Sequence, residues 1–244
     1  VNAFIRVKQL QDPEYNMSHN LLFCTRKGVI KKTKLEAYSR PRQNGVNAIT
    51  IREDDQVIQV RLTTGDSQII MANKHGRAIR FHESTVREMG RTATGVRGMT
   101  LDETGDDEVI GMICIKDPEK ETVMVVSEQG YGKRSEIEDY RITNRGGKGV
   151  KTLNITEKTG NLVAIKSVTD ENDLVIINKS GITLRMKVAD VRIMGRATQG
   201  VRLINLEKRN DEIASVCKVL SETESDSSNS ENIESASEIN EAEA

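Results

Sequence analysis

The chain has 244 residues, of which 36% are hydrophobic and 30% are charged, a balance typical of a globular domain with a hydrated surface. No apolar run approaches the roughly 18 residues of a membrane helix, and no basic-then-apolar leader begins the sequence. We therefore expect neither a transmembrane segment nor secretion, but a cytoplasmic protein. The formal net charge of −1 hides an uneven distribution.

The charge divides the chain into a basic body and an acidic tail. Residues 221–244 hold eight acidic residues and no lysine or arginine, which leaves 36 basic against 29 acidic residues, a net charge of +7, on residues 1–220. A basic body predicts a polyanionic partner. The segment 220–244 is rich in Ser, Asn and Glu and is predicted to be disordered. It could compete with such a partner for the basic body, or only keep the chain soluble.

The N-terminal 19 residues differ from the rest of the chain. Residues 1–8 (VNAFIRVK) alternate apolar and polar side chains, which predicts the closing strand of an earlier repeat that is missing. Residues 9–19 contain the turn formers Asp12, Pro13 and Asn16, so we expect a linker there.

Four repeats occupy the remainder of the basic body, at about residues 20–63, 67–115, 121–168 and 172–219. Each has a first glycine and, 17 or 19 residues later, a second glycine that is followed by valine. The first glycines are Gly28, Gly76, Gly130 and Gly181, and the second are Gly45, Gly95, Gly149 and Gly200. This regular spacing indicates one structural unit repeated four times.

Each repeat is predicted to be all-β. A short apolar run precedes the first glycine, as in residues 123–126 (VMVV), and another closes the repeat, as in 162–165 (LVAI). Short runs with β-branched residues and a glycine turn favour strands over helices. About four short strands in a period of about 40–50 residues predict propeller-like blades, which must stack because one blade cannot bury its own faces.

The sequence offers no catalytic or metal-binding motif. The three cysteines, Cys24, Cys114 and Cys217, are widely spaced without a CxxC, and the three histidines have no metal-ligand spacing. Gly130-Tyr131-Gly132 lacks the third glycine of a dinucleotide fingerprint. We therefore expect no cofactor, no metal and no catalytic residue in this stretch.

Cations recur at equivalent positions of the repeats. Lys32, Arg80, Arg134 and Arg185 stand four residues after a first glycine; Arg42, Arg91, Arg145 and Arg196 precede a second glycine; Arg97, Lys151 and Arg202 follow one. If the repeats are arranged around an axis, their equivalent positions form a belt of cations. Such a belt supplies positive charge at regular intervals to a bent phosphate backbone and does not contact the bases. The loop 145–149 (RGGKG) adds glycines whose backbone N–H groups can approach a phosphate. With Lys133 and Lys148, these residues are the candidate DNA-binding set. A single cation at a strand end could equally serve only to solvate a surface.

These residues resemble the C-terminal domain of the A subunit of bacterial DNA gyrase. The resemblance covers about residues 1–219, and its motifs are 28–33 (GVIKKT), 83–91 (ESTVREMGR) with 94–98 (TGVRG), 130–134 (GYGKR) and 195–202 (GRATQGVR). The family's gyrase-A box, QRRGGKG, is echoed at 145–149 without its leading Gln-Arg.

The resemblance implies a β-pinwheel, a propeller-like ring of six blades whose strands swap between neighbours and which wraps duplex DNA around its rim. It implies that the full enzyme, which also contains the gyrase B protein and a second copy of the A protein, introduces negative supercoils using ATP and Mg²⁺ bound elsewhere. Two alternatives stay open: the equivalent domain of topoisomerase IV, which grips DNA without strong wrapping, and a propeller-like protein-interaction module.

Overall fold

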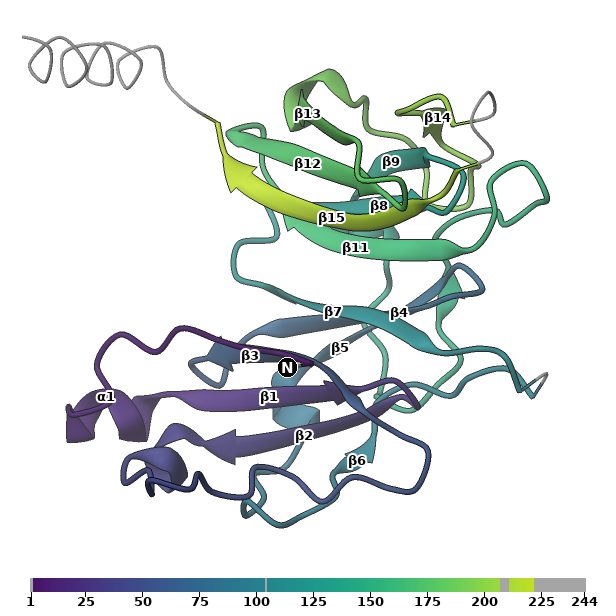
Figure 1. Ribbon diagram of the computed structural model, residues 1–244. Helices are drawn as coiled ribbons and strands as arrows, with labels where there is room; N and C mark the ends of the chain where they lie inside the picture. The colour runs from purple at the N-terminus through teal and green to yellow at the C-terminus, as the bar shows by residue number, and fades with distance from the viewer. Residues whose placement is uncertain (1, 104, 207–210, 222–244) are drawn as a thin grey trace, which may run out of the picture.

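The computed structural model describes residues 2–103, 105–206 and 211–221, and it is built almost wholly of β-strands (Figure 1). The strands form antiparallel sheets that follow one another from the purple N-terminal end to the yellow C-terminal end (Figure 1). In the described part of the chain the only α-helix is α1, Pro13–Ser18, and no helix there is long and apolar enough to cross a membrane. The all-β, propeller-like class predicted from the repeats is confirmed.

Each repeat contributes a hairpin and a closing strand to its sheet. Sheet one contains β1 (Asn20–Thr25), β2 (Val29–Lys34) and β3 (Val57–Thr63), and sheet two contains β4 (Gln68–Asn73), β5 (Arg77–His82) and β7 (Val109–Ile115). Sheet three contains β8 (Thr122–Ser127), β9 (Tyr131–Glu136) and β11 (Leu162–Val168), and sheet four contains β12 (Asn172–Asn178), β13 (Thr183–Lys187) and β15 (Ile213–Leu220). Short 3₁₀ helices follow the hairpins: η1 (Leu35–Tyr38), η2 (Glu83–Thr85), η3 (Ile137–Asp139) and η4 (Val188–Asp190).

The fourth strand of each of the first three sheets comes from the next repeat. These strands are β6 (Val96–Arg97), β10 (Val150–Lys151) and β14 (Val201–Arg202), each directly after a second glycine. They pair with β2, β5 and β9 of the preceding repeat, giving the orders β3-β1-β2-β6, β10-β5-β4-β7 and β11-β8-β9-β14. Strand exchange between neighbouring blades, which the family resemblance implied, is therefore present.

The exchange explains the glycines that mark the repeat. Gly28 has φ +81°, and a Cβ there would lie 2.6 Å from the carbonyl oxygen of Met99 in the next repeat. The backbone N–H of Gly98 donates to the Gly28 carbonyl at 2.8 Å. Only glycine allows both the left-handed turn and this close approach. The glycine spacing of the sequence thus records contacts between repeats as well as turns.

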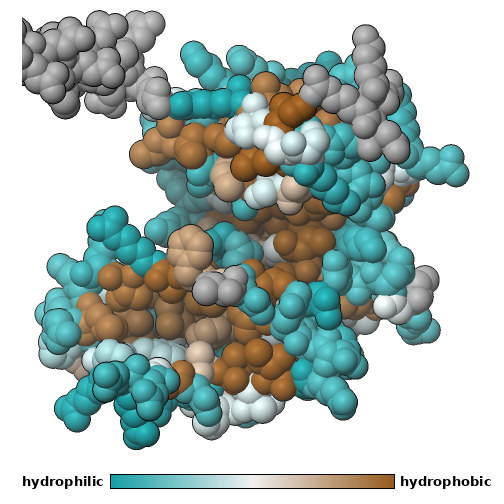
Figure 2. Space-filling view, viewed as in Figure 1, coloured by the Kyte–Doolittle hydropathy of each residue, from teal (hydrophilic) through white to brown (hydrophobic). Residues whose placement is uncertain are grey.

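The hydrophobic core lies between consecutive sheets. One cluster joins Leu22 and Ile30 of sheet one to Met71 and Phe81 of sheet two, and two similar clusters occur between sheets two and three and between three and four. The hairpin strands of the first three sheets are accordingly buried on both faces, as in β8, where all six residues are buried, whereas β13 of sheet four is partly exposed. In the space-filling view hydrophobic side chains gather over the sheets and hydrophilic ones around the edges (Figure 2). Fully burying each large aliphatic side chain is worth about 1.5–3 kcal/mol.

Each sheet has an inner edge, formed by its closing strand, and an outer edge on the opposite side. The closing strands β3, β7, β11 and β15 contact one another in that order. The exchanged strands β6, β10 and β14 lie at the opposite edge of their sheets. The loops that hold the second glycines therefore lie along the outer rim of the stack.

The N-terminal segment differs from the prediction. Residues 2–8 form no strand, because their backbone makes no ladder with a neighbour, although Ala3, Ile5 and Val7 do pack against the cluster of Leu21 and Phe23. The segment 9–19, predicted as a linker, contains α1, which begins after Asp12, whose carboxylate accepts the N–H groups of the first turn. The predicted tail, apart from its first two residues, lies outside the described residues.

Candidate nucleic-acid interface

The cations that stand four residues after the first glycine of repeats one, two and three lie inside the molecule. Lys32, Arg80 and Arg134 are 6%, 3% and 4% exposed, respectively. Lys32 Nζ donates to the carbonyl of Glu83 at 3.3 Å, Arg80 to that of Ile137 at 2.8 Å, and Arg134 to that of Val188 at 3.2 Å. Each acceptor is the first residue of the 3₁₀ helix of the next repeat. This position therefore connects neighbouring blades, and its buried side chains are poorly placed for a phosphate.

The fourth member of this set is placed differently. Arg185 belongs to the last described repeat, and its side chain is 41% exposed and bonded to Asp173 at 2.8 Å. In the other three repeats the cation at this position bonds to the next repeat, and Arg185 has no described repeat after it. Arg185 lies on β13 and is not part of the loop of its second glycine.

Lys133 is also buried, and its side chain bonds to the loop that holds the second glycine of the next repeat. Its Nζ donates to the carbonyl of Gly195 at 2.7 Å, and Lys31, at the same position of repeat one, donates to that of Arg91 at 2.5 Å. Burial lowers the pKa of Lys31 and of Lys133 to about 8. Both ammonium groups thus hold a rim loop of the next repeat and do not face solvent.

Apart from Arg42, the remaining cations lie on three rim loops, which we call the rim strip: residues 89–97, 144–151 and 194–202. The loops contact each other across the blades. The guanidinium of Arg145 donates to the carbonyl of Arg97 at 3.0 Å, and that of Arg196 donates to the carbonyl of Lys151 at 2.9 Å. The N–H of Gly146 also donates to the carbonyl of Gly98 at 2.7 Å. The rim strip is therefore one continuous surface that crosses three blades.

The rim strip carries seven cations and no carboxylate. Arg97, Lys148, Lys151 and Arg202 are exposed, and Arg91, Arg145 and Arg196 are half-buried. Arg202 donates to the hydroxyl of Tyr131 at 2.8 Å and lies over its ring. Arg42 is exposed on the loop of repeat one and lines an open hollow together with Arg91. A surface of one sign concentrates counter-charge along its length.

Sequence reasoning missed a further set of cations beside the rim strip. Arg87, Arg141 and Arg192 are all exposed and stand eleven residues after a first glycine. Each comes directly after a buried residue, Val86, Tyr140 or Val191 respectively, so the next side chain points outward. The same repeat spacing that singled out the other cations could have found these three.

The repeats, the exchanged strands and the basic outer edge define a propeller-like repeat protein of the pinwheel type. Comparison with known proteins then gives the family. The family model described as "DNA gyrase C-terminal domain, beta-propeller" matches residues 19–64, 67–116, 121–169 and 172–217, and the chain belongs to this family. The family resemblance of the motifs is thereby confirmed.

The relatives agree with this assignment. The DNA gyrase A subunit of Staphylococcus aureus (strain NCTC 8325 / PS 47) is 45% identical over 231 residues, which are 95% of this chain and 25% of that protein. The chain thus spans about a quarter of the length of the curated relatives it matches. A crystal structure of the C-terminal domain of DNA topoisomerase IV superposes with TM-score 0.79 at 26% identity, covering 86% of this chain and 64% of the other. A DNA gyrase A C-terminal domain superposes with TM-score 0.74 at 27% identity, covering 84% and 67%.

Proposed function

We propose that this chain is the part of a gyrase A protein that binds duplex DNA without sequence specificity and bends it around the rim strip. The observation that carries the proposal is the continuity of the rim strip: seven cations and no carboxylate on loops that contact one another across three blades. Arg42, Arg87, Arg141 and Arg192 extend the same surface. Lys32, Arg80, Lys133 and Arg134 support it from within.

Electrostatics supplies the energy for bending. Bending a site of 20–30 base pairs by 40–90° costs on the order of 1–6 kcal/mol. Each phosphate that is neutralised by a cation releases counterions and adds about 0.9 to the slope of log affinity against log salt. Seven contacts along the rim strip would give a slope of about −6, so the binding should weaken steeply with salt.

Sequence-independent binding follows from the elements available. Reading bases in the major groove requires a helix or a two-stranded ribbon that fits into it. The rim strip consists of loops and of two-residue strands that are already paired with their neighbours. Its arginines and lysines, with the N–H groups of the glycine loops, suit phosphate oxygens.

In the full protein, this domain would support ATP-dependent negative supercoiling. The cleaving tyrosine, ATP and Mg²⁺ would lie outside this stretch, and the gyrase B protein and a second copy of the A protein would be contacted through the N-terminal part. Such an enzyme works on chromosomal DNA, so its place is the cytoplasm.

A DNA-binding titration over a salt series, with duplexes of several lengths, tests the proposal. We expect affinity to rise with duplex length and the triple variant Arg97→Ala, Lys151→Ala, Arg202→Ala to reduce the salt slope by about 2.7. The matched control removes three exposed cations at the inner edge of the sheets, Lys116, Lys120 and Lys218, and should leave the slope nearly unchanged. Weak, length-independent binding, or equal losses in the two triple variants, would overturn the proposal; saturation by a protein partner instead of DNA would favour an interaction module.

The topoisomerase IV domain remains a second candidate, because a structure of that type superposes as well as the gyrase domain does. The two functions differ in wrapping. Ligation of a nicked plasmid with the bound protein, followed by removal of the protein, measures it. A changed linking number supports a gyrase-type domain, and an unchanged one supports a domain that grips DNA without wrapping.

A further inference from the structure

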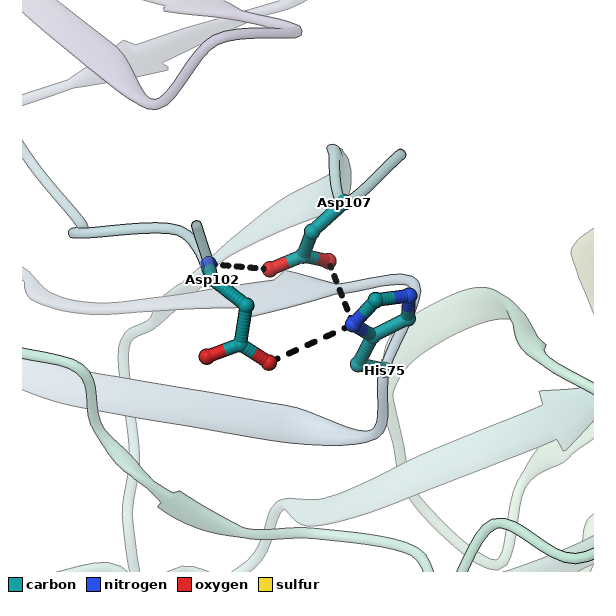
Figure 3. Close-up of side chains that lie close together, drawn as sticks. All are labelled: His75, Asp102 and Asp107. Carbon is teal, nitrogen blue, oxygen red and sulfur yellow. Dashed lines mark hydrogen bonds and ion pairs between the residues drawn. The ribbon is translucent and has the colours of Figure 1, made fainter. Parts of the chain in front are cut away.

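Outside the rim, repeat two gathers a histidine and two aspartates that are far apart in the sequence. His75 lies in the turn between β4 and β5, and Asp102 and Asp107 lie in the connection from β6 to β7 (Figure 3). His75 Nδ1 is 3.2 Å from Asp102 Oδ2 and 3.9 Å from Asp107 Oδ1. One ligand atom of each residue lies within 4.8 Å of the other two. The sequence spacing could not predict this, because the contact depends on the fold.

The carboxylate of Asp107 is fixed and has one oxygen without a donor. Its side chain is fully buried. Asn73 Nδ2 donates to Oδ2 at 2.6 Å and the backbone N–H of Asp102 donates to the same oxygen at 3.0 Å. Oδ1, by contrast, has no hydrogen-bond donor and faces the ring of His75 (Figure 3). A buried carboxylate oxygen without a donor is costly unless a cation lies beside it.

The equivalent aspartates of repeats one and four accept hydrogen bonds from their own repeat, and neither faces an imidazole. Asp55 in repeat one accepts the backbone N–H groups of Lys27 and Gln56. Asp211 in repeat four accepts the hydroxyl of Ser180 and the N–H of Glu212. Repeat two places an imidazole where these repeats have Lys27 and Ser180, and a second aspartate, Asp102, joins it. The cluster is therefore specific to repeat two and is not a general feature of the blade.

From this arrangement we propose that His75, Asp102 and Asp107 bind a divalent first-row transition metal ion, of the class of Zn²⁺ or Mn²⁺. One imidazole nitrogen with carboxylate oxygens is a donor set typical of these ions, whereas Ca²⁺ and Mg²⁺ prefer oxygen alone. With bonds of about 2.1 Å, two ligand atoms on a tetrahedral ion lie about 3.4 Å apart. The distances of 3.2 and 3.9 Å from Nδ1 lie on either side of this value.

The other ring nitrogen of His75 has the partner that a metal-bound imidazole usually has. Nε2 is 3.4 Å from Oδ2 of Asp106. A ligating histidine commonly donates its second N–H to a carboxylate, which fixes the ring and strengthens the metal bond. Asp106 is thus a positioning residue, and the three carboxylates around one imidazole leave negative charge for a dication to neutralise.

The bound ion would connect two parts of repeat two. The turn 74–76 belongs to the hairpin, and the connection that contains Asp102 and Asp107 leads from β6 on the rim strip to β7 at the inner edge. A ligand that binds only the folded state raises the melting temperature as its concentration increases. The expected consequence is a metal-dependent gain in stability that is independent of DNA.

The test uses the full chain, treated with a chelator and dialysed, then titrated with ZnCl₂ or MnCl₂ by calorimetry and thermal unfolding. We expect one ion per chain, a rising Tm, and at least tenfold weaker binding in Asp102→Asn and in His75→Gln. Glu103→Gln removes a charge from the residue next to Asp102 and should bind as the native chain does. Only one side-chain oxygen of Asp102 contacts His75, and asparagine has nearly the same shape as aspartate. We therefore expect Asp102→Asn to fold.

Three results would overturn the proposal. The first is equal metal affinity in the native chain, Asp102→Asn and His75→Gln. The second is no metal-dependent rise in Tm of the native chain. The third is an NMR spectrum in which the His75 ring stays a protonated ion-pair partner of the aspartates at saturating Zn²⁺. Direct binding of Co²⁺ in place of Zn²⁺, followed by its visible absorption, would support nitrogen and oxygen ligation of the ion.

Discussion

The guanidinium of Arg145 donates to the backbone carbonyl of Arg97 at 3.0 Å, across the boundary between repeats three and two. A second bond runs from Arg145 to the carbonyl of Thr85, also at 3.0 Å. Arg196 forms the equivalent bond to Lys151 one blade further along. The half-buried arginines of the rim strip thus fix the backbone on which their exposed neighbours stand.

Arg145 and Arg97 should therefore fail in different ways when replaced. Arg145→Ala removes two charge-assisted hydrogen bonds from a partly exposed site, so we expect a loss of stability of about 1–2 kcal/mol together with weaker DNA binding. Arg97→Ala removes an exposed side chain, so its stability should change by less than about 0.5 kcal/mol while the salt slope falls by about 0.9. Urea unfolding and salt-series titrations of both variants measure this. Equal destabilisation by the two would contradict the assigned roles.

Arg134 should behave as a structural residue. Its guanidinium is buried, donates to Thr122 and Val188, and lies 2.7 Å from a carboxylate oxygen of Asp170. Arg134→Ala removes a buried guanidinium and the donor of the Val188 carbonyl, and we expect a loss of about 3 kcal/mol in the free energy of unfolding. The salt slope of DNA binding should not change.

Arg185→Ala is the matched control, because it alters the same repeat position where the side chain is half exposed. Its loss should be smaller than that of Arg134→Ala, because the Arg185 side chain is 41% exposed and already contacts water. If Arg134→Ala reduced the salt slope by one phosphate contact while leaving stability intact, the buried placement would not describe the protein in solution.

Arg134 and Arg196 indicate what the sequence could and could not predict. The four repeats, their strands and the glycine positions follow from spacing alone, because turns and close contacts impose glycine at fixed intervals. Arg134 and Arg196 look alike in sequence, each being a cation at a repeated position. What separates them is burial: Arg134 lies in β9, in a sheet covered on both faces, where alternation of side chains no longer distinguishes inside from outside.

The remaining differences also come from long-range contacts. The exchanged strands β6, β10 and β14 pair across repeats, and no local pattern in two residues can specify such a partner. The candidate set accordingly mixed rim residues with residues that connect blades. The exposed Arg87, Arg141 and Arg192 follow the same repeat spacing but lie next to neither glycine of their repeat.

The buried lysines predict a dependence of stability on pH. Burial lowers the pKa of Lys133 to about 8, below its value near 10.4 in an unfolded chain. Between these values the unfolded state binds more protons than the folded state, so stability should rise with pH in this window. Urea unfolding from about pH 7.5 to 9.5 should show the rise, and Lys133→Met should reduce it.

The unfolding measurements should stay below about pH 10, because tyrosine ionises above that pH in an unfolded chain. Burial raises the pKa of Tyr140 to about 12, so its ionisation in the unfolded state opposes folding at higher pH. The difference between the native chain and Lys133→Met cancels this background. An identical pH profile in the two proteins would mean that Lys133 is not desolvated.

The first glycines offer the sharpest test of how the repeats meet. Gly130 and Gly181 hold the same repeat position and have φ +75° and +87°. A Cβ on Gly130 would lie 2.7 Å from the carbonyl oxygen of Ile204 in the next repeat, whereas a Cβ on Gly181 meets nothing within 4 Å. Alanine costs about 1–2 kcal/mol at either site for the left-handed backbone. Only Gly130→Ala adds the clash, which we expect to cost about a further 1–3 kcal/mol. Urea unfolding of both variants isolates the contribution of the contact between repeats, and equal losses would show that these glycines serve their turns alone.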